Sequence, residues 1–167
     1  MRRAAIFSTM CAMVMLAGAA YGQAPAGAKQ RGEYNFYGGA ASSALRSARD
    51  YSSNYQTYTR SAQPVNPEVA KETADAIGDY ITKAEKHFAW MRKQAQASND
   101  KETLTSLDSI DKNLADAKKH HGNLCEYCAK DTVDAKDSMK CCQEIDASLA
   151  KAIADHDKLM KRLSSKK

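Results

Sequence analysis

Residues 64–97 read PVNPEVAKETADAIGDYITKAEKHFAWMRKQAQA, and this stretch decides the fold class. Its start is a boundary, because Asn66 is a favourable N-cap residue and Pro67 suits the first position of a helix. Beyond Pro67, apolar residues recur at spacings of four and three, which is the pattern of one helix face in a bundle. The predicted buried face contains Ala70, Ala74, Ile77, Ile81, Ala84, Phe88, Met91 and Ala95.

Two later segments carry the same pattern. Ser98 to Asp100 ends the first helix, and Asn99 with Glu102 resembles a capping box that starts the next one. Gly122 lies inside the second segment, but the unbroken spacing around it predicts that the helix continues. Residues 130–137 then form a turn. The predicted buried faces contain Leu107, Ile110, Leu114, Ala117, His121, Leu124 and Cys128, and then Cys142, Ile145, Leu149, Ala152, His156, Leu159 and Leu163.

A weaker helix is predicted before Pro64, over residues 40–62. Its regular face is rich in alanine and tyrosine, and packing onto a neighbouring helix is favoured over cofactor binding. Residues 23–39 are a loose mixture of Gly, Ala, Gln and Tyr, which predicts a flexible leader. Short connections favour antiparallel neighbours, so residues 40–167 are expected to form an all-α, up-down antiparallel helical bundle. The predicted face of the weak helix contains Ala44, Ala48, Tyr51, Tyr55, Tyr58 and Ala62.

The N-terminus has the pattern of an export signal. Arg2 and Arg3 precede an apolar run at residues 6–16, and Ala20 and Gly22 are small residues suited to a cleavage site. We therefore expect residues 1–22 to be a signal peptide that is cut near Gly22, and the protein to be periplasmic or secreted. No later stretch is apolar and long enough to span a bilayer, so none is expected in the mature chain.

The charge distribution argues against nucleic-acid binding. The net charge is +5, but residues 64–167 contain as many acidic as basic residues, so the predicted bundle is neutral. Nucleic-acid binding requires a basic stripe or patch. No pair of carboxylates, Ser/His/Asp set or Gly-rich phosphate loop stands out either, and the sequence therefore favours a protein that is not an enzyme.

The unusual residues lie in a window of histidines and cysteines between residues 120 and 142. The helical register places His121, Cys125 and Cys128 on one face, and antiparallel pairing brings Cys141 and Cys142 towards them. Thiolate and imidazole ligands suit Zn or Cu(I). The function predicted from the sequence is therefore transition-metal binding, of Cu or Zn, by this cluster at the last helical hairpin.

The alternative for the same sulfurs is disulfide bonding. Four cysteines remain after residue 22, an even number in a compartment that is expected to be oxidising. Cys128 and Cys142 are predicted to face each other at the same height, which makes them the natural pair. In this alternative the chain is a stapled structural or interaction protein without metal, and its Tyr-rich residues 34–58 face a protein partner.

A second cluster is predicted further along the bundle. His87, Met91, His156 and Met160 are expected at similar heights on facing helices. Histidine and thioether ligands suit copper or a b-type haem. The other interpretation is that these four side chains are ordinary parts of the core.

Overall fold

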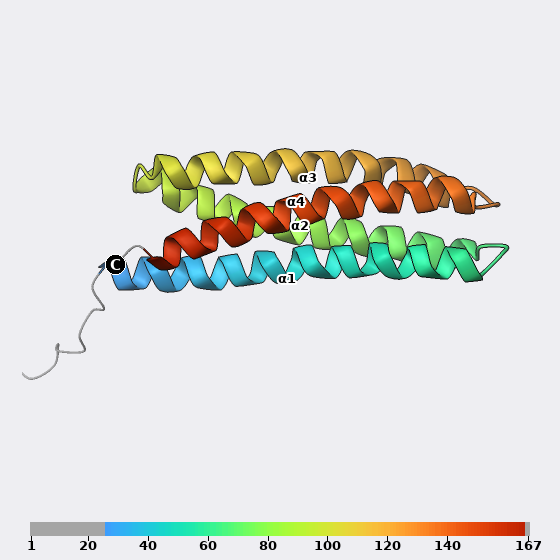
Figure 1. Cartoon of the computed structure of the whole chain (residues 1–167), viewed down its shortest axis with the longest axis horizontal. Coiled ribbons are helices and arrows are strands. Elements are labelled where there is room, and N and C mark those ends of the chain that lie inside the picture. The colour runs from blue at the N-terminus through green and yellow to red at the C-terminus, as the bar shows by residue number, and fades with distance from the viewer. Residues whose placement is uncertain (1–25, 166–167) are drawn as a thin grey trace, which may run out of the picture.

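The computed structural model describes residues 26–165, with side chains from residue 30 onward, and this part of the chain is entirely helical apart from three short connections. Figure 1 shows four long helices lying alongside one another. Their bounds are α1 Ala26–Ser61, α2 Pro67–Ala97, α3 Lys101–Cys128 and α4 Ala135–Ser165. The signal peptide predicted over residues 1–22 lies outside the described residues.

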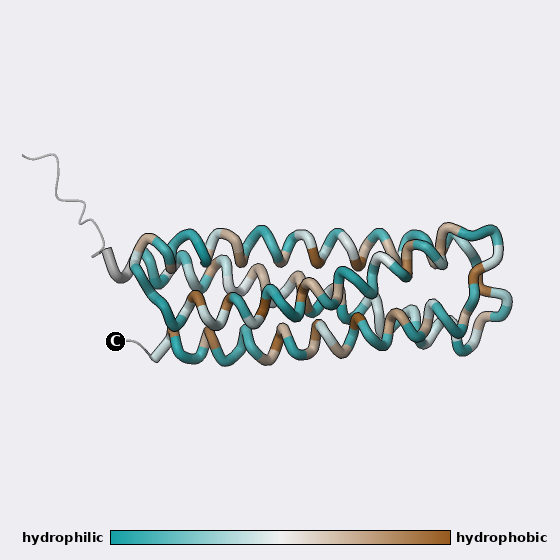
Figure 2. The backbone as a smooth tube through the Cα atoms, turned by 90° about the horizontal axis from the view of Figure 1, so that it is seen from above, coloured by the Kyte–Doolittle hydropathy of each residue, from teal (hydrophilic) through white to brown (hydrophobic). Residues whose placement is uncertain are grey.

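The helices form an up-down bundle in which each helix packs on two others. α1 packs on α2 and α4, and α3 packs on the same two helices, so α1 lies diagonally across from α3. The chain reverses direction at each connection (Figures 1 and 2). The predicted all-α bundle is confirmed for the described residues. No helix among them is long and apolar enough to cross a membrane.

Polar caps explain where the central helices begin. The Asn66 side chain accepts a hydrogen bond from the Glu68 amide at 2.8 Å, as expected for the predicted N-cap. The N-cap of α3 is Asp100, whose carboxylate accepts from the Thr103 amide at 3.0 Å. The prediction of Asn99 at this position is wrong by one residue. Asn99 instead makes the turn, with a φ of 53° that asparagine tolerates better than most residues.

The core follows the apolar pattern closely in α2 and α4. All eight predicted residues of α2 are buried, and α3 continues through Gly122 to Cys128. Along each helix in Figure 2, hydrophobic positions recur at intervals between hydrophilic ones. Of the α4 prediction, only Leu163 is less than fully buried, where it packs at the margin of the core.

The buried face of α1 differs from the prediction. Tyr51 was expected in the core but is 41% exposed, whereas Ser52 and Thr59 are buried. The Ser52 hydroxyl donates to the Cys142 carbonyl at 2.8 Å, and the Thr59 hydroxyl donates to the Tyr55 carbonyl at 3.0 Å. These hydrogen bonds satisfy both hydroxyls without water, so the polar residues can occupy core positions. Ala44, Ala48 and Tyr55 of the predicted face are buried, whereas Ser52 and Thr59 take the core positions predicted for Tyr51 and Tyr58.

α1 also begins earlier than expected. It starts at Ala26, so most of residues 23–39, which the sequence suggested to be a flexible leader, are helical. Tyr34 is buried there, and its ring lies edge-on to Trp90 of α2, with 6.1 Å between ring centroids. The contact with Trp90 buries the Tyr34 ring, although the composition of residues 23–39 does not suggest a packed segment.

Two glycines give a matched prediction about helix packing. A Cβ on Gly122 would meet no other atom within 4 Å, so Gly122→Ala is expected to raise the free energy of unfolding by about 0.5–1 kcal/mol. A Cβ on Gly78 would lie 2.7 Å from the His121 ring, so Gly78→Ala is expected to lower it instead. Thermal denaturation of both variants measures the two effects. An equal gain in both would contradict the close packing of His121 against Gly78.

Candidate functional site

The four cysteines of the bundle lie at the end where α3 passes into α4. Cys125 and Cys128 are in the last turn of α3, and Cys141 and Cys142 are near the start of α4. The carboxylate of Asp134 caps α4 by accepting hydrogen bonds from the amides of residues 136 and 137, each at 2.9 Å. Because Asp134 sets the start of α4, it also sets where Cys141 and Cys142 lie along the bundle axis relative to α3.

The thiols are part of the packed core. Cys128, Cys141 and Cys142 are buried, and Cys125 is partly exposed. Burial raises the pKa of Cys128 to about 11, although the neighbouring Tyr55 hydroxyl opposes this. Burial likewise raises the pKa of Cys142 to about 12, against the effect of the Ser52 hydroxyl. At neutral pH these sulfurs are therefore protonated thiols, which are poor nucleophiles.

The prediction of a Cu or Zn site is wrong. No group of three or more His, Cys, Asp or Glu side chains in the described chain is arranged to hold a metal ion. The five residues proposed as ligands are His121, Cys125, Cys128, Cys141 and Cys142. The register correctly placed His121 beside Cys125 and Cys142 in the core, but His121 Nε2 is bonded to the Ala74 carbonyl of α2 and the five side chains do not converge on one point.

The predicted disulfide is also not formed. Cys128 and Cys142 are free thiols, as are Cys125 and Cys141. The seam positions of Cys128 and Cys142 bring both sulfurs into the core near Tyr55, where each influences the ionisation of the ring hydroxyl. The pair therefore fills space in the core and does not act as a staple in this structure.

His121 is held between α2 and α3. Its Nε2 donates to the Ala74 carbonyl at 2.8 Å, and its ring occupies the space left by Gly78. The Cys125 sulfur lies 3.4 Å from the same nitrogen. Because Nε2 carries the proton given to Ala74, it cannot also accept the thiol proton, and burial raises the pKa of Cys125. This Cys–His pair is therefore not arranged as a nucleophile with its base.

The second predicted cluster is divided between two places. His87 lies against Tyr37 on the outside of α1 and α2, with 5.9 Å between ring centroids. Met91 is in the core, and His156 is buried, with its ring edge-on to Phe88 at 5.8 Å. Met160 is partly buried and packs over Gly38. Met91 and His156 are therefore buried in the core and Met160 packs against it, and their use as ligands stays a prediction.

His156 makes the stability of the fold depend on pH. Burial lowers its pKa, while the Asp157 carboxylate 3.4 Å away opposes this, and Arg46 adds to the lowering. An unfolded histidine titrates near pH ~6.5, so below that pH the unfolded chain binds more protons than the fold does. The free energy of unfolding is therefore expected to fall as the pH drops below about 6.5.

The contribution of His156 can be isolated by substitution. His156→Gln cannot titrate, so the slope of unfolding free energy against pH is expected to be smaller in this variant than in the natural chain. Urea denaturation followed by circular dichroism across this pH range measures both slopes. Identical slopes would show that His156 is not the group responsible.

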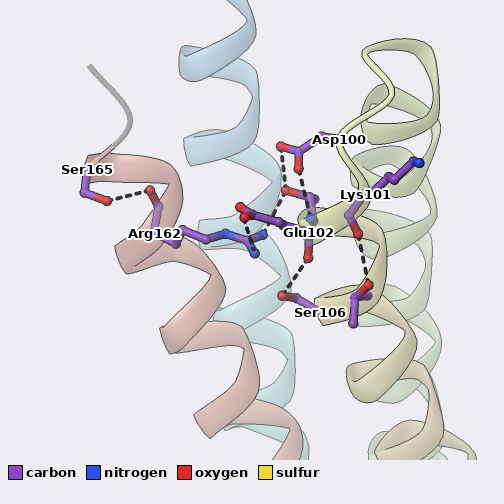
Figure 3. Close-up of polar contacts among 8 residues, drawn as sticks. Asp100, Lys101, Glu102, Ser106, Arg162 and Ser165 are labelled. Carbon is purple, nitrogen blue, oxygen red and sulfur yellow. Dashed lines mark hydrogen bonds and ion pairs between the residues drawn. The ribbon is translucent and has the colours of Figure 1, made fainter.

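At the opposite end of the bundle, Arg162 links α4 to α3. In Figure 3 its side chain reaches from α4 to the start of α3, where Nη2 donates to the Thr103 hydroxyl at 3.0 Å and Nη1 lies 3.7 Å from the Glu102 carboxylate. An open hollow of about 550 Å³ lies beside this end, lined by residues that include Tyr34, Asn99 and Leu163. Its lining mixes both charges with apolar atoms and favours no single class of ligand.

An aromatic surface lies on the outer side of α1 and α2, and the sequence pattern indicated it only in part. Tyr37 stacks on Trp90 with 3.9 Å between ring centroids, and Tyr51 lies beside Tyr80 at 5.7 Å. Phe36 packs against Tyr37 but remains 68% exposed. The signal available in the sequence was that Tyr80 and Trp90 fall outside the predicted buried face of their helix, whereas Tyr51 was predicted to be buried. We call Phe36, Tyr37, Tyr51, Tyr80 and Trp90 the aromatic surface.

Comparison with known proteins leaves the fold and this surface as the only guides to function. No family model, no curated protein and no solved structure matches this chain.

Proposed function

We propose that this chain is an exported interaction protein, whose bundle is a rigid support that presents the aromatic surface to a protein partner. Export is supported by Arg2, Arg3 and the apolar run at residues 6–16, which have the composition of a signal peptide. The sequence led to the expectation that the Tyr-rich residues 34–58 face a protein partner. The proposal keeps this role but assigns it to a different set of tyrosines.

The observation that carries the proposal is the distribution of exposed apolar side chains. Among the described side chains, the large hydrophobic residues that remain exposed are Phe36, Tyr51 and Val69. All three belong to α1 or α2, and none belongs to α3 or α4. Exposed apolar residues that gather on one face mark interaction sites more often than scattered ones do. Aromatic residues also dominate the centres of protein interfaces.

The tyrosines of residues 34–58 differ in burial, and Tyr58 is partly buried, with its hydroxyl accepting a hydrogen bond from the Asn66 amide at 3.0 Å. Tyr34 and Tyr55 are 6% and 2% exposed and serve the core. Tyr51 is 41% exposed and Tyr37 is partly buried, both lie beside rings of α2, and these two are the ones proposed to meet a partner. The proposed surface therefore includes Tyr80 and Trp90 of α2, which lie outside the segment singled out from the sequence.

Site-specific photo-crosslinking in the cells that make the protein tests this function. A photoreactive amino acid is placed at Phe36 or Tyr51, and at the exposed Lys112 of α3 as the control. The expected result is a defined protein adduct from the two α1 positions and none from residue 112. Adducts that form equally at all three positions, or at none, would contradict a partner-binding role for this surface.

A further inference from the structure

The outer side of α2 carries charges in an ordered pattern next to the aromatic surface. Glu72, Asp79, Lys86 and Lys93 follow one another at intervals of seven residues, so they lie in one row along the helix. All four are exposed, and none forms an ion pair with another side chain in the described part of the chain. The first two are acidic and the last two are basic, so the row is negative at one end and positive at the other.

This row is complementary to itself when it is reversed. In an antiparallel alignment of two α2 helices, Asp79 of each copy lies opposite Lys86 of the other, and Glu72 lies opposite Lys93. A single register satisfies both pairs, because the four residues are evenly spaced. In a parallel alignment with the same residues opposite each other, every charge would meet its like, which is unfavourable.

The aromatic surface fits the same arrangement. The two-fold axis of the antiparallel pair falls between Asp79 and Lys86, beside Lys83, whose ammonium lies 4.6 Å from the centroid of the Tyr80 ring, so Tyr51, Tyr80 and Lys83 lie near the centre of the contact. Phe36 is near the start of α1 and Val69 is near the start of the antiparallel α2, so Phe36 of each copy then lies towards the end of the other copy that carries Val69. The charged row then lies along the contact between the two α2 helices, and the rings of the aromatic surface lie beside it.

The size of the face is sufficient for a stable dimer. α1 has 36 residues and α2 has 31, which at about 1.5 Å per residue gives a face roughly 45–55 Å long. Two helices side by side are about 20 Å wide, so the face covers on the order of 1,000 Å² per copy. Stable interfaces bury about 800 Å² per partner.

We propose that a second copy of this chain is the partner, bound through an antiparallel, two-fold symmetric contact of the α1–α2 faces. This proposal rests on the partner-binding function above, and it identifies the partner that covers the surface as a second copy of the chain. A symmetric contact of this kind closes on itself, so the assembly stops at two copies.

Sedimentation equilibrium of the full chain tests whether it dimerises. Two variants, each reversing two charges of the row on α2, are compared with the natural chain. The natural chain is expected to sediment with twice its monomer mass at low salt. One variant carries Lys86→Glu with Lys93→Glu, and the other carries Glu72→Lys with Asp79→Lys. Each variant alone is expected to be monomeric, because like charges then meet across the contact, and circular dichroism checks that each keeps its helical content.

Mixing the two variants is the decisive step. Every pair across the contact then joins opposite charges, so a dimer containing one copy of each is expected to reappear. A monomeric natural chain, or variants that dimerise as well alone as when mixed, would overturn the proposal. If the chain is monomeric while position 36 still crosslinks to a different protein, self-association is refuted and the partner-binding function stands.

Discussion

Replacing Phe88 with alanine is expected to lower the free energy of unfolding by about 3–5 kcal/mol. Phe88 is 1% exposed and is among the largest side chains that are fully enclosed in the core. Its removal leaves a cavity between α2 and the buried ring of His156, and the long helices cannot close it without losing contacts elsewhere. Urea denaturation followed by circular dichroism measures the loss.

Phe36 provides a control with the same chemical change. It is 68% exposed, so Phe36→Ala is expected to alter the free energy of unfolding by no more than about 0.5 kcal/mol. The contrast separates the role of aromatic residues in the core from their role on the aromatic surface. Similar losses in the two variants would show that Phe36 is part of the core, in conflict with its exposure in the structure.

The buried thiols are expected to resist alkylation while the protein is folded. Burial raises the pKa of Cys142 from an ordinary value of 9.0 to about 12, so at about pH 8 its thiolate fraction falls roughly a thousandfold. Because the thiolate is the reactive form, its labelling rate should fall by at least that factor. For Cys128, with a pKa of about 11, the factor is roughly one hundred.

Labelling with iodoacetamide and mass spectrometry measures these rates for each cysteine. Cys125 is partly exposed and is expected to react first, and all four should react rapidly once guanidinium unfolds the chain. Labelling of Cys142 in the folded protein at the rate of Cys125 would contradict its place in the core. Slow reaction would also explain how unpaired thiols persist if the protein is exported as proposed, because oxidation too requires the thiolate.

The sequence was most informative where packing follows hydrophobic periodicity. The buried face of α2 could be predicted residue by residue, because its apolar positions repeat without interruption and its flanking positions are charged. The cap at Asn66 followed from local chemistry alone. The face of α1 was predicted only in part, because Ser52 and Thr59 enter the core through hydrogen bonds to backbone carbonyls that hydrophobic periodicity does not reveal.

The candidate metal site shows a different limit. Register and antiparallel pairing correctly brought the cysteines to one end of the bundle, but they did not determine side-chain direction. His121 turns to the Ala74 carbonyl because Gly78 leaves room for its ring, and that space exists only when α2 and α3 are packed. The aromatic surface was partly visible in the tyrosines of α1, but its other half depended on knowing that Trp90 and Tyr80 lie beside them.

If the proposed function is right, another protein molecule covers the aromatic surface in the cell. Hydroxyl-radical footprinting of the protein in its own cells tests this most directly, with the purified chain at high dilution for comparison and Tyr127 of α3 as an internal reference. We expect Phe36 and Tyr51 to be oxidised several times more slowly in the cell than in the dilute chain, while Tyr127 is unchanged. Equal oxidation of Phe36 and Tyr51 in the two samples would contradict a covered surface.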